Sequence, residues 1–552
     1  MRKLYIGRID DGFAPADDEV LGAWCFQGRE DVHPRWFAHD FITPFLERDV
    51  RIRNGHMTAA LAEHLVAQNA KKLNARFGVD YDALFWKQVL YNWLFYITQN
   101  LWTLYRVVED FVDREKGDAF VVKGAEDAPP VSDTLALVDD LYNAGPIFVW
   151  LASQAVRALA PESWVIEEPD AIPTLRHARR YEPPPISVIR QQLKLSIPGF
   201  FARNAIRACL MLAPKRRSRA LVFDTGNQVN GFPKAFLQLL SDVLDVTIPS
   251  SIEQRFAELD AMSDGVNYRP GRLTLGRYDT LDELTSIVVA KALKHGERFV
   301  SVQHGTAYGF SGVMPYVAAM EYQHHAFITW GWMRHGDYGG NFVPLPFPGF
   351  ARFFGKHHGE GAGIMLVGGC PMATDARIDI FPSYTLYYRQ KMEFLSGLSS
   401  KIKERFQYRL YPQVYPDAFD EEGSLKTYYP EIEFVCGNLD EAILGCELVI
   451  FDHPSTAMHN ALVANSPCML FWNPSWWPLS ADKEGDFNTL RQAGILFDTP
   501  QDALRHLDVI EGNVAAWWQS DPVQEARRLW LVAHGRADAS WFWNWVKAIW
   551  RL

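Results

Sequence analysis

Apolar residues in the first 215 positions recur mostly at helical spacing. The stretch HMTAALAEHLVAQNAKKLNARFG (56–78) has this spacing and ends at a glycine, a common closing residue of helices. The stretch ALFWKQVLYNWLFYITQNLWTLYRVVEDFV (83–112) is long, aromatic and poor in charge, which predicts one or two core helices. We therefore expect a helical N-terminal region over residues 1–215.

The pattern changes at RALVFDTGN (219–227), where an apolar β-forming run ends in polar residues. Helical patterns at 232–244 and 282–296 then alternate with the strand-like runs FVSVQHG (299–305) and HHAFITWG (324–331). Gly296 stands where the second helix should close. Alternating strands and helices predict a parallel sheet, so residues 216–355 form a first Rossmann-like unit.

A second alternation begins near residue 362 and defines the last region, 356–552. Its predicted strands lie in GIMLVGG (363–369), FQYRLYP (406–412), CELVIFDHPST (446–456) and PCMLFWNP (467–474), with helices over 383–398 and 457–466. The fold class is thus α/β. Two facing Rossmann-type units predict a GT-B-like architecture, with a ligand held between the carboxyl ends of the two sheets.

The end of the sequence, SWFWNWVKAIWRL (540–552), carries one apolar helical stripe made of Trp541, Trp545, Ala548, Ile549 and Leu552. Flanking cations make this pattern typical of a helix lying in a membrane interface. A closing helix that crosses back onto the first Rossmann-like unit would have the same pattern, and we favour that interpretation.

Composition narrows the class of protein. The net charge of −11 over 552 residues argues against nucleic acid as a partner, because no overall positive field exists to collect phosphates. Six cysteines without CxxC spacing fit free thiols in a reducing compartment. We find neither a secretory signal nor a long apolar run, and so expect a cytoplasmic protein, with peripheral contact to the inner membrane left open.

The segment QHGTAYG (303–309) ends a strand in an unusual way. It falls at the carboxyl end of a predicted parallel strand, where α/β sheets hold ligands. Gly305 and Gly309 permit positive φ angles and close approach of the backbone to a ligand. His304 can donate a proton or hydrogen bond to a departing phosphate oxygen. The alternative is a structural histidine in a tight turn.

A second polar loop, IFDHPSTAMHNALVANSP (450–467), begins a helix. Ser455 and Thr456 can cap this helix, and its free N–H groups can bind a phosphate or carboxylate. Arg409, at a neighbouring strand end, could pair with a nucleotide phosphate. The alternative is that it is an ordinary arginine on the protein surface. Together with residues of the first loop, the predicted substrate and nucleotide contacts are Gln303, Gly305, Thr306, Arg409, Tyr411, Asp452, His453, Ser455, Thr456 and Asn460.

Several carboxylates follow the strands of the first unit and could take part in chemistry. They are Asp224, Asp279, Asp282 and Glu321, and Asn227 lies beside the first of them. Each of these residue types is also common as a helix cap or turn residue. The phosphate-loop, HExxH, GxGxxG and nucleophile-elbow motifs are missing, so we expect neither a metal nor a cofactor.

The order of LGAWC (21–25), LNARFGVDYDALFWKQVLYNWL (73–94), FVSVQHGTAYG (299–309) and FITWGW (327–332) resembles a family of transferases from bacterial surface-carbohydrate gene clusters. Such proteins combine QHGxxYG with a strand ending in TWGW. More remotely, QHG followed by the DHPST loop resembles capsule polysaccharide transferases. That group includes retaining enzymes that transfer Kdo (3-deoxy-manno-octulosonic acid) from CMP-Kdo.

The resemblance implies a glycosyltransferase that moves a sugar from a nucleotide donor, with a CMP-linked acidic sugar favoured, to a surface glycan or glycolipid. It implies that the second unit holds the nucleotide and that His304 and a carboxylate of the first unit face the reacting carbon. A polyol-phosphate transferase of the same architecture is an alternative. A non-catalytic, glycan-binding assembly protein is another.

Overall fold

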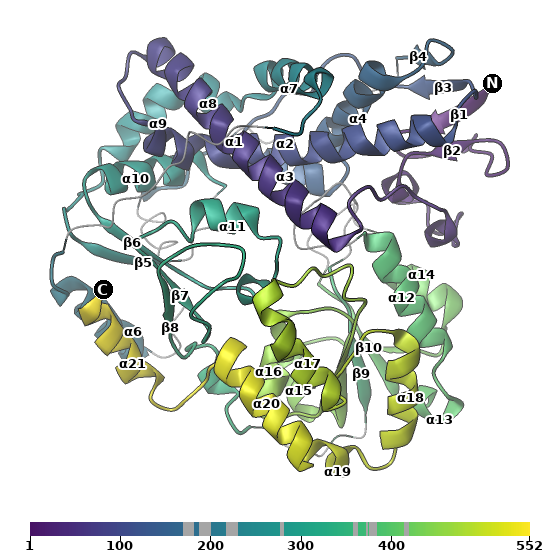
Figure 1. The fold of residues 1–552 in the computed structure, drawn as a ribbon, viewed down its shortest axis with the longest axis vertical. Helices are drawn as coiled ribbons and strands as arrows, with labels where there is room; N and C mark the ends of the chain where they lie inside the picture. Colours follow the sequence, from purple (N-terminus) through teal and green to yellow (C-terminus); the bar gives the residue numbers. More distant parts are fainter. Residues whose placement is uncertain are drawn as a thin grey trace.

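The structure is a computed structural model of the 552-residue chain. It describes residues 1–168, 181–186, 200–216, 230–276, 281–356, 361, 363–370, 374, 383–412 and 419–552. Within these ranges the strands form three parallel sheets enclosed by helices (Figure 1). The predicted strand at 219–227, with Asp224 and Asn227, lies outside the described residues, as does Asp279.

Two long helices dominate the N-terminal region and confirm the first prediction. They are α1 (Arg48–Phe77) and α2 (Ala83–Arg114), which pack against each other across the upper part of the molecule (Figure 1). The Asp82 carboxylate caps α2 by accepting from the Phe85 N–H. Gly78 closes α1 in the left-handed conformation at φ 66°. Helix α1 begins eight residues before the predicted stretch, and α2 is one continuous helix.

The N-terminal region also contains a four-stranded parallel sheet, so the prediction of a helical region is incomplete. The strands run in the order β2-β1-β3-β4. They are β1 (Arg2–Tyr5), β2 (Glu19–Val20), β3 (Phe120–Lys123) and β4 (Val165–Glu167), and the helices after β3 are α3 (Thr134–Tyr142) and α4 (Pro146–Leu159). These strands have only two to four residues, which is too short for an alternating pattern to stand out.

The second parallel sheet contains the QHG strand and has the simple order β5-β6-β7-β8. Its strands are β5 (Leu273–Gly276), β6 (Arg298–Val302), β7 (Ala326–Thr329) and β8 (Phe342–Pro344). The helices of this region are α6 (Phe200–Leu212), α7 (Lys234–Thr247), α8 (Ser250–Glu253), α9 (Phe256–Ser263), α10 (Glu283–Lys294) and α11 (Pro315–Met320). Gly296 has φ 76°, as expected for the residue that closes α10.

The third sheet has the order β11-β10-β9-β12-β13-β14. Its strands are β9 (Ile364–Val367), β10 (Phe406–Arg409), β11 (Glu433–Phe434), β12 (Leu448–Phe451), β13 (Cys468–Phe471) and β14 (Leu496–Phe497). Its helices are α12 (Tyr384–Ser396), α13 (Ser400–Lys403), α14 (Glu421–Tyr428), α15 (Leu439–Gly445), α16 (Thr456–Ala464), α17 (Glu484–Gln492) and α18 (Pro500–Ile510). This is the doubly wound order, in which ligands bind where the direction of winding reverses, between β9 and β12.

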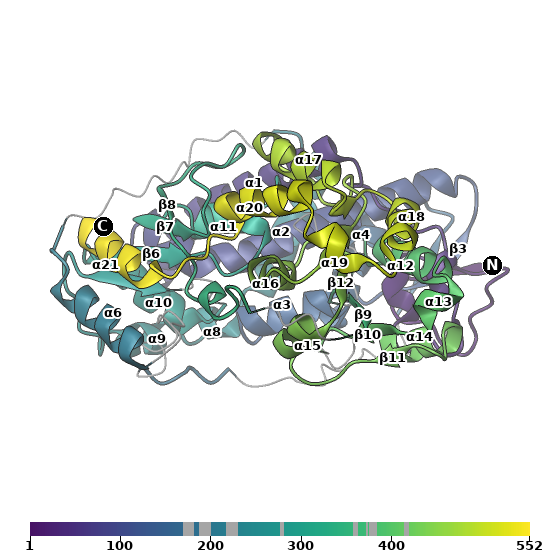
Figure 2. The same ribbon diagram turned by 90° about the horizontal axis from the view of Figure 1, so that it is seen from below.

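The last three helices return the chain from the third sheet to the second. They are α19 (Val514–Trp518), α20 (Asp521–His534) and α21 (Trp541–Arg551). Trp545, Ala548 and Ile549 of α21 are buried in one cluster with Val300 and Ile328 of β6 and β7. The predicted packing of this helix on the QHG sheet is therefore observed, and α21 lies beside α6 (Figures 1 and 2).

Among the residues that the structure describes, we find no single helix with the length and apolar character needed to span a membrane. Helices α3 and α4 reach that threshold only as a pair, and the pair is bent by 71°.

Candidate functional site

The turn after β6 is attached to the turn after β7 by the side chain of Gln303. Its Oε1 accepts hydrogen bonds from the Trp330 backbone N–H at 2.9 Å and from Trp332 Nε1 at 2.8 Å. The Trp330 indole in turn donates to the Gln303 carbonyl at 3.0 Å. The QHG and TWGW motifs thus form one buried unit. Gln303 positions the turn, a different role from the substrate contact expected from the sequence.

The glycines of QHGTAYG serve a purpose different from the expected one. Neither Gly305 nor Gly309 has a positive φ angle. A Cβ atom on Gly309 would come within 2.4 Å of Cδ1 of the buried Trp332, and one on Gly305 would lie 3.1 Å from the Tyr308 ring. The absence of a side chain therefore lets aromatic rings of the protein pack against the turn, and the expectation of left-handed backbone there was wrong.

His304 begins a chain of polar contacts that leads into the core. The Tyr308 hydroxyl lies 2.5 Å from His304 Nε2 and donates to Glu321 Oε1 at 3.2 Å. The Glu321 side chain is fully buried, whereas 20% of the His304 side chain stays exposed. A ligand can therefore reach the imidazole. Glu321 lies next to His304, and the Tyr308 ring stands between its carboxyl group and the exposed side of the imidazole.

The turn after β12 carries a second histidine with a carboxylate partner. His453 Nδ1 lies 2.8 Å from Oδ1 of Asp452, which is completely buried. The Tyr387 hydroxyl lies 2.8 Å from both oxygens of Asp452 and accepts from the Gly369 backbone N–H at 2.7 Å. Gly369 follows β9, so Tyr387 joins the ends of β9 and β12 at the point where the winding reverses.

A buried ammonium group lies beneath these contacts. Lys391 on α12 is paired with Glu421 and donates to the Tyr408 hydroxyl at 2.7 Å. Its Nζ atom is also 3.8 Å from Asp452 Oδ2, and the lysine side chain has no exposed surface. A single cation is therefore shared by two buried carboxylates, which makes it the electrostatic support of the turn after β12.

The two turns meet directly. The Thr306 hydroxyl donates to the Ser455 carbonyl at 3.0 Å and lies 2.7 Å from His459 Nδ1 on α16. Nearby, Gly312 N donates to the Pro478 carbonyl and Ser480 N to the Phe310 carbonyl, both at 2.8 Å. The turns that carry His304 and His453, predicted from two separate units, are therefore neighbours.

The sequence model of one protein family matches residues 2–182 and 186–549, and its description is LIC12162 family transferase. The chain belongs to this transferase family. No curated protein matches the chain. The family name supports a transferase and leaves the group that is transferred open.

Other predicted site residues have structural partners in this transferase. Asp282 caps α10 by accepting from Thr285 N at 2.7 Å, and its other oxygen accepts from the Tyr181 hydroxyl at 2.8 Å. Arg409 donates to the carbonyls of Val435 and Gly437 at 2.9 and 2.7 Å. Asp282 thus caps α10, and Arg409 ties β10 to the turn after β11; their predicted roles in catalysis and in phosphate binding stay predictions.

The remaining predicted residues of the second loop lie on or near α16. Ser455 is the cap of this helix, and its hydroxyl accepts from Met458 N at 3.4 Å. Thr456 is exposed at the first helical position. Asn460 lies one turn further and donates to Asp440 Oδ1 at 3.3 Å, which links α16 to α15. Tyr411, beyond β10, is 41% exposed.

Sequence reasoning missed Tyr308, Tyr387, Lys391, Tyr408 and Glu421. Tyr387 and Lys391 are four residues apart on α12, and therefore lie on the same side of the helix. The available signal was a lysine in the tyrosine-rich helical stretch YTLYYRQKM (384–392), which follows the strand that ends in two glycines. A buried lysine needs a carboxylate partner, so a lysine on the apolar side of a helix predicts a buried ion pair.

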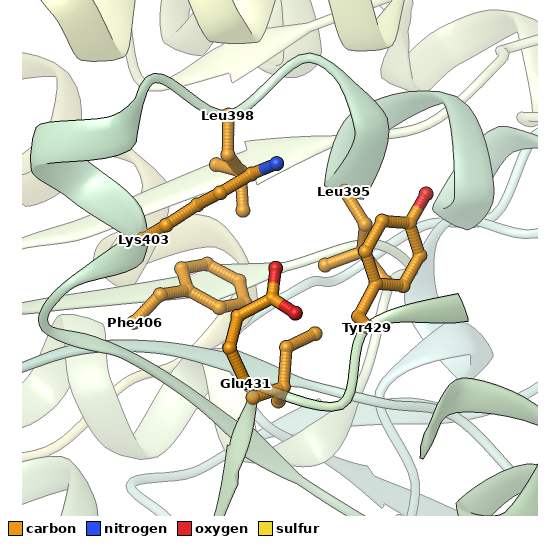
Figure 3. A pocket seen from close by; sticks show the side chains of 7 residues that line it. Leu395, Leu398, Lys403, Phe406, Tyr429 and Glu431 are labelled. Atoms are coloured by element: carbon orange, nitrogen blue, oxygen red, sulfur yellow. The ribbon is translucent and has the colours of Figure 1, made fainter. Parts of the chain in front are cut away.

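One small crevice lies elsewhere, at the amino end of β10 (Figure 3). Its volume is about 10 Å³, which is room for about one water molecule. It is lined by Leu395, Leu398, Lys403, Phe406, Tyr429, Glu431 and Ile432. The crevice is at the edge of the sheet opposite to the turns described above, and we assign it no role. Among the described residues, no group of His, Cys, Asp and Glu could hold a metal ion.

The contact between the turns predicts a measurable pH dependence of stability. Burial lowers the pKa of His459 to about 3, below its ordinary value of 6.5. Between these values the unfolded chain binds a proton that the folded protein does not, so stability falls as the pH falls. In the His459→Gln variant, the unfolding free energy should depend less steeply on pH between about 4 and 6, by about 1.4 kcal/mol per pH unit.

Urea unfolding at a series of pH values would measure this slope. The control is His295→Gln, because His295 is exposed at the end of α10. Equal slopes for the wild type and His459→Gln would show that His459 takes up its proton in the folded state.

Proposed function

We propose that this protein is a GT-B-type glycosyltransferase. It would move a sugar from a nucleotide donor to a bacterial surface glycan or glycolipid, in keeping with its transferase family. The resemblance to Kdo-transferring enzymes favours a CMP-linked acidic sugar as the donor. A polyol-phosphate transferase would use the same architecture with a different donor.

One observation carries the proposal. The Thr306 hydroxyl binds the Ser455 carbonyl at 3.0 Å, which brings the carboxyl-end turns of two parallel sheets together. Ligands of α/β sheets bind beyond the carboxyl ends of the strands. A donor and an acceptor held by different sheets would then meet between His304 and His453.

The third sheet supplies the features expected of a nucleotide side. Its doubly wound order places the turns after β9 and β12 side by side. The N-terminus of α16 begins at Thr456, and the unpaired N–H groups of a helix start attract a phosphate. The Asp452 carboxylate, held by Tyr387, orients the His453 ring next to this helix start.

His304, in the turn after β6 of the QHG sheet, is the group that would assist the departure of the nucleotide. An imidazolium at His304 can donate a proton or a hydrogen bond to the phosphate oxygen that leaves the sugar carbon. The Tyr308 hydroxyl, which also donates to Glu321, holds the His304 ring in position. If the configuration is retained, one of the predicted carboxylates, Asp224, Asp279, Asp282 or Glu321, would attack the sugar carbon.

Nucleotide binding tests the proposal directly. We expect CMP to raise the melting temperature in a thermal-shift screen that also contains CDP, UDP and GDP, because a ligand of the folded state stabilises it. The same protein should hydrolyse the matching sugar donor slowly. A shift with CDP alone would favour the polyol-phosphate alternative. The absence of any shift would contradict the transferase proposal and favour a glycan-binding module.

A further inference from the structure

Helices α6 and α21 pack side by side at one end of the molecule. They lie side by side in both views, with the C-terminal residue beside them and the N-terminus at the far end (Figures 1 and 2). Their inner sides are buried against the QHG sheet through Ile206, Trp545, Ala548 and Ile549. This packing fixes which sides of the two helices face outward.

The outward side is unusually apolar. Phe201, Met211 and Leu212 of α6 are 86%, 81% and 69% exposed, and Trp543 and Trp550 of α21 are 64% and 43% exposed. The two tryptophans are seven residues apart, so they lie on the same side of the helix, two turns from each other. In the part of the chain that the structure describes, no other tryptophan is classed as exposed. We call these five residues and their cationic neighbours the α6–α21 face.

The charges of this face have a single sign. Residues 200–216 contain Arg203, Arg207, Lys215 and Arg216, and residues 541–552 contain Lys547 and Arg551. Neither segment contains an aspartate or glutamate, although the whole chain has a net charge of −11. Arg216 also donates to the Trp550 carbonyl at 3.3 Å, which ties the segment after α6 to the end of α21. The positive charges are therefore held around the exposed tryptophans.

We propose that the α6–α21 face docks on an anionic lipid surface. Tryptophans with an apolar body and a polar N–H prefer the boundary between headgroups and acyl chains. Lysine and arginine beside them attract negative headgroups. A second copy that docked through the same face would bring like charges together, whereas an anionic lipid surface is complementary to them. A transferase with a membrane-anchored acceptor would gain from this attachment, but the proposal does not depend on the nature of the transferred group.

Co-sedimentation of the full chain with vesicles tests the proposal. Vesicles of phosphatidylcholine with one third phosphatidylglycerol should bind the wild type, and pure phosphatidylcholine should bind it about tenfold less. Raising the salt concentration should weaken binding to the anionic vesicles because it screens the charges. The double variants Trp543→Ser/Trp550→Ser and Lys547→Gln/Arg551→Gln should each lower the affinity about tenfold or more.

The matched control is Phe354→Ser/Val509→Ser, which removes two exposed apolar side chains outside the α6–α21 face. It should bind as the wild type does. All four substituted side chains of the test variants are exposed, so an unchanged melting temperature should accompany the loss of binding. Equal binding by wild type and both test variants would overturn the proposal. A dimer in analytical ultracentrifugation that Trp543→Ser/Trp550→Ser dissociates would overturn it too.

Discussion

Replacement of His304 by alanine is expected to lower the rate of sugar transfer by about 10²- to 10⁴-fold, the usual contribution of a positioned acid or base. The residue is the exposed end of the contacts that run through Tyr308 to Glu321. Because the proposed nucleotide contacts lie on the third sheet, the thermal shift caused by the nucleotide should persist in this variant. The measurement is the release of nucleotide from the sugar donor in the presence of acceptor.

Two further variants test whether the effect is specific to His304. His295→Ala removes an exposed histidine that stacks on Tyr268, at a ring distance of 5.0 Å, and should leave the transfer rate unchanged. Tyr308→Phe keeps the ring but removes the hydroxyl between His304 and Glu321, so it should reduce turnover less than His304→Ala. A wild-type rate in His304→Ala would remove this histidine from the mechanism.

Replacement of Lys391 by methionine is expected to lower the unfolding free energy by about 3–5 kcal/mol. The lysine side chain has no exposed surface, and its loss would leave Glu421 and Asp452 as buried charges without their shared cation. The midpoint of urea unfolding measures the change. The double variant Lys391→Met/Glu421→Gln should regain part of the stability, because one of the two uncompensated charges is removed.

Lys401→Met is the matched control, since Lys401 pairs with Glu511 at the surface and 73% of its side chain is exposed. Such a surface pair contributes about 0–1 kcal/mol, so this variant should unfold nearly as the wild type does. Similar losses of unfolding free energy in Lys391→Met and Lys401→Met would show that the charge of Lys391 does not stabilise the buried carboxylates.

Local patterns in the sequence were sufficient for six of the ten described strands in the second and third sheets, whereas β5, β8, β11 and β14 were missed. The strands ending at Val302, Thr329, Val367 and Phe451 were predicted because each is a short apolar run that stops at polar residues or glycines. Helices α7, α10, α12 and α16 were predicted from their apolar spacing, and Gly296 marked the end of α10. The 303–309 and 452–456 turns follow strands of different sheets, and their meeting was expected because two Rossmann-type units were predicted to face each other.

Long-range contacts were not predictable in the same way. The first sheet pairs Leu4 with Val122 across more than a hundred residues, and no short pattern encodes such pairing. The sequence also did not predict the partners of Asp282 and Arg409, which are Tyr181 and the carbonyls of Val435 and Gly437. The glycines of QHGTAYG were identified as special, but only the position of Trp332 explains why Gly309 carries no side chain.

The hydrogen bonds of Thr306, Gly312 and Ser480 have a consequence for motion. All three cross from the QHG sheet to the third sheet within a short distance of the turns that carry His304 and His453. A hinge rotation that moved the QHG sheet and the third sheet widely apart would break these three hydrogen bonds together. We therefore expect substrates to enter by rearrangement of local loops, with the catalytic groups already in register before the donor arrives.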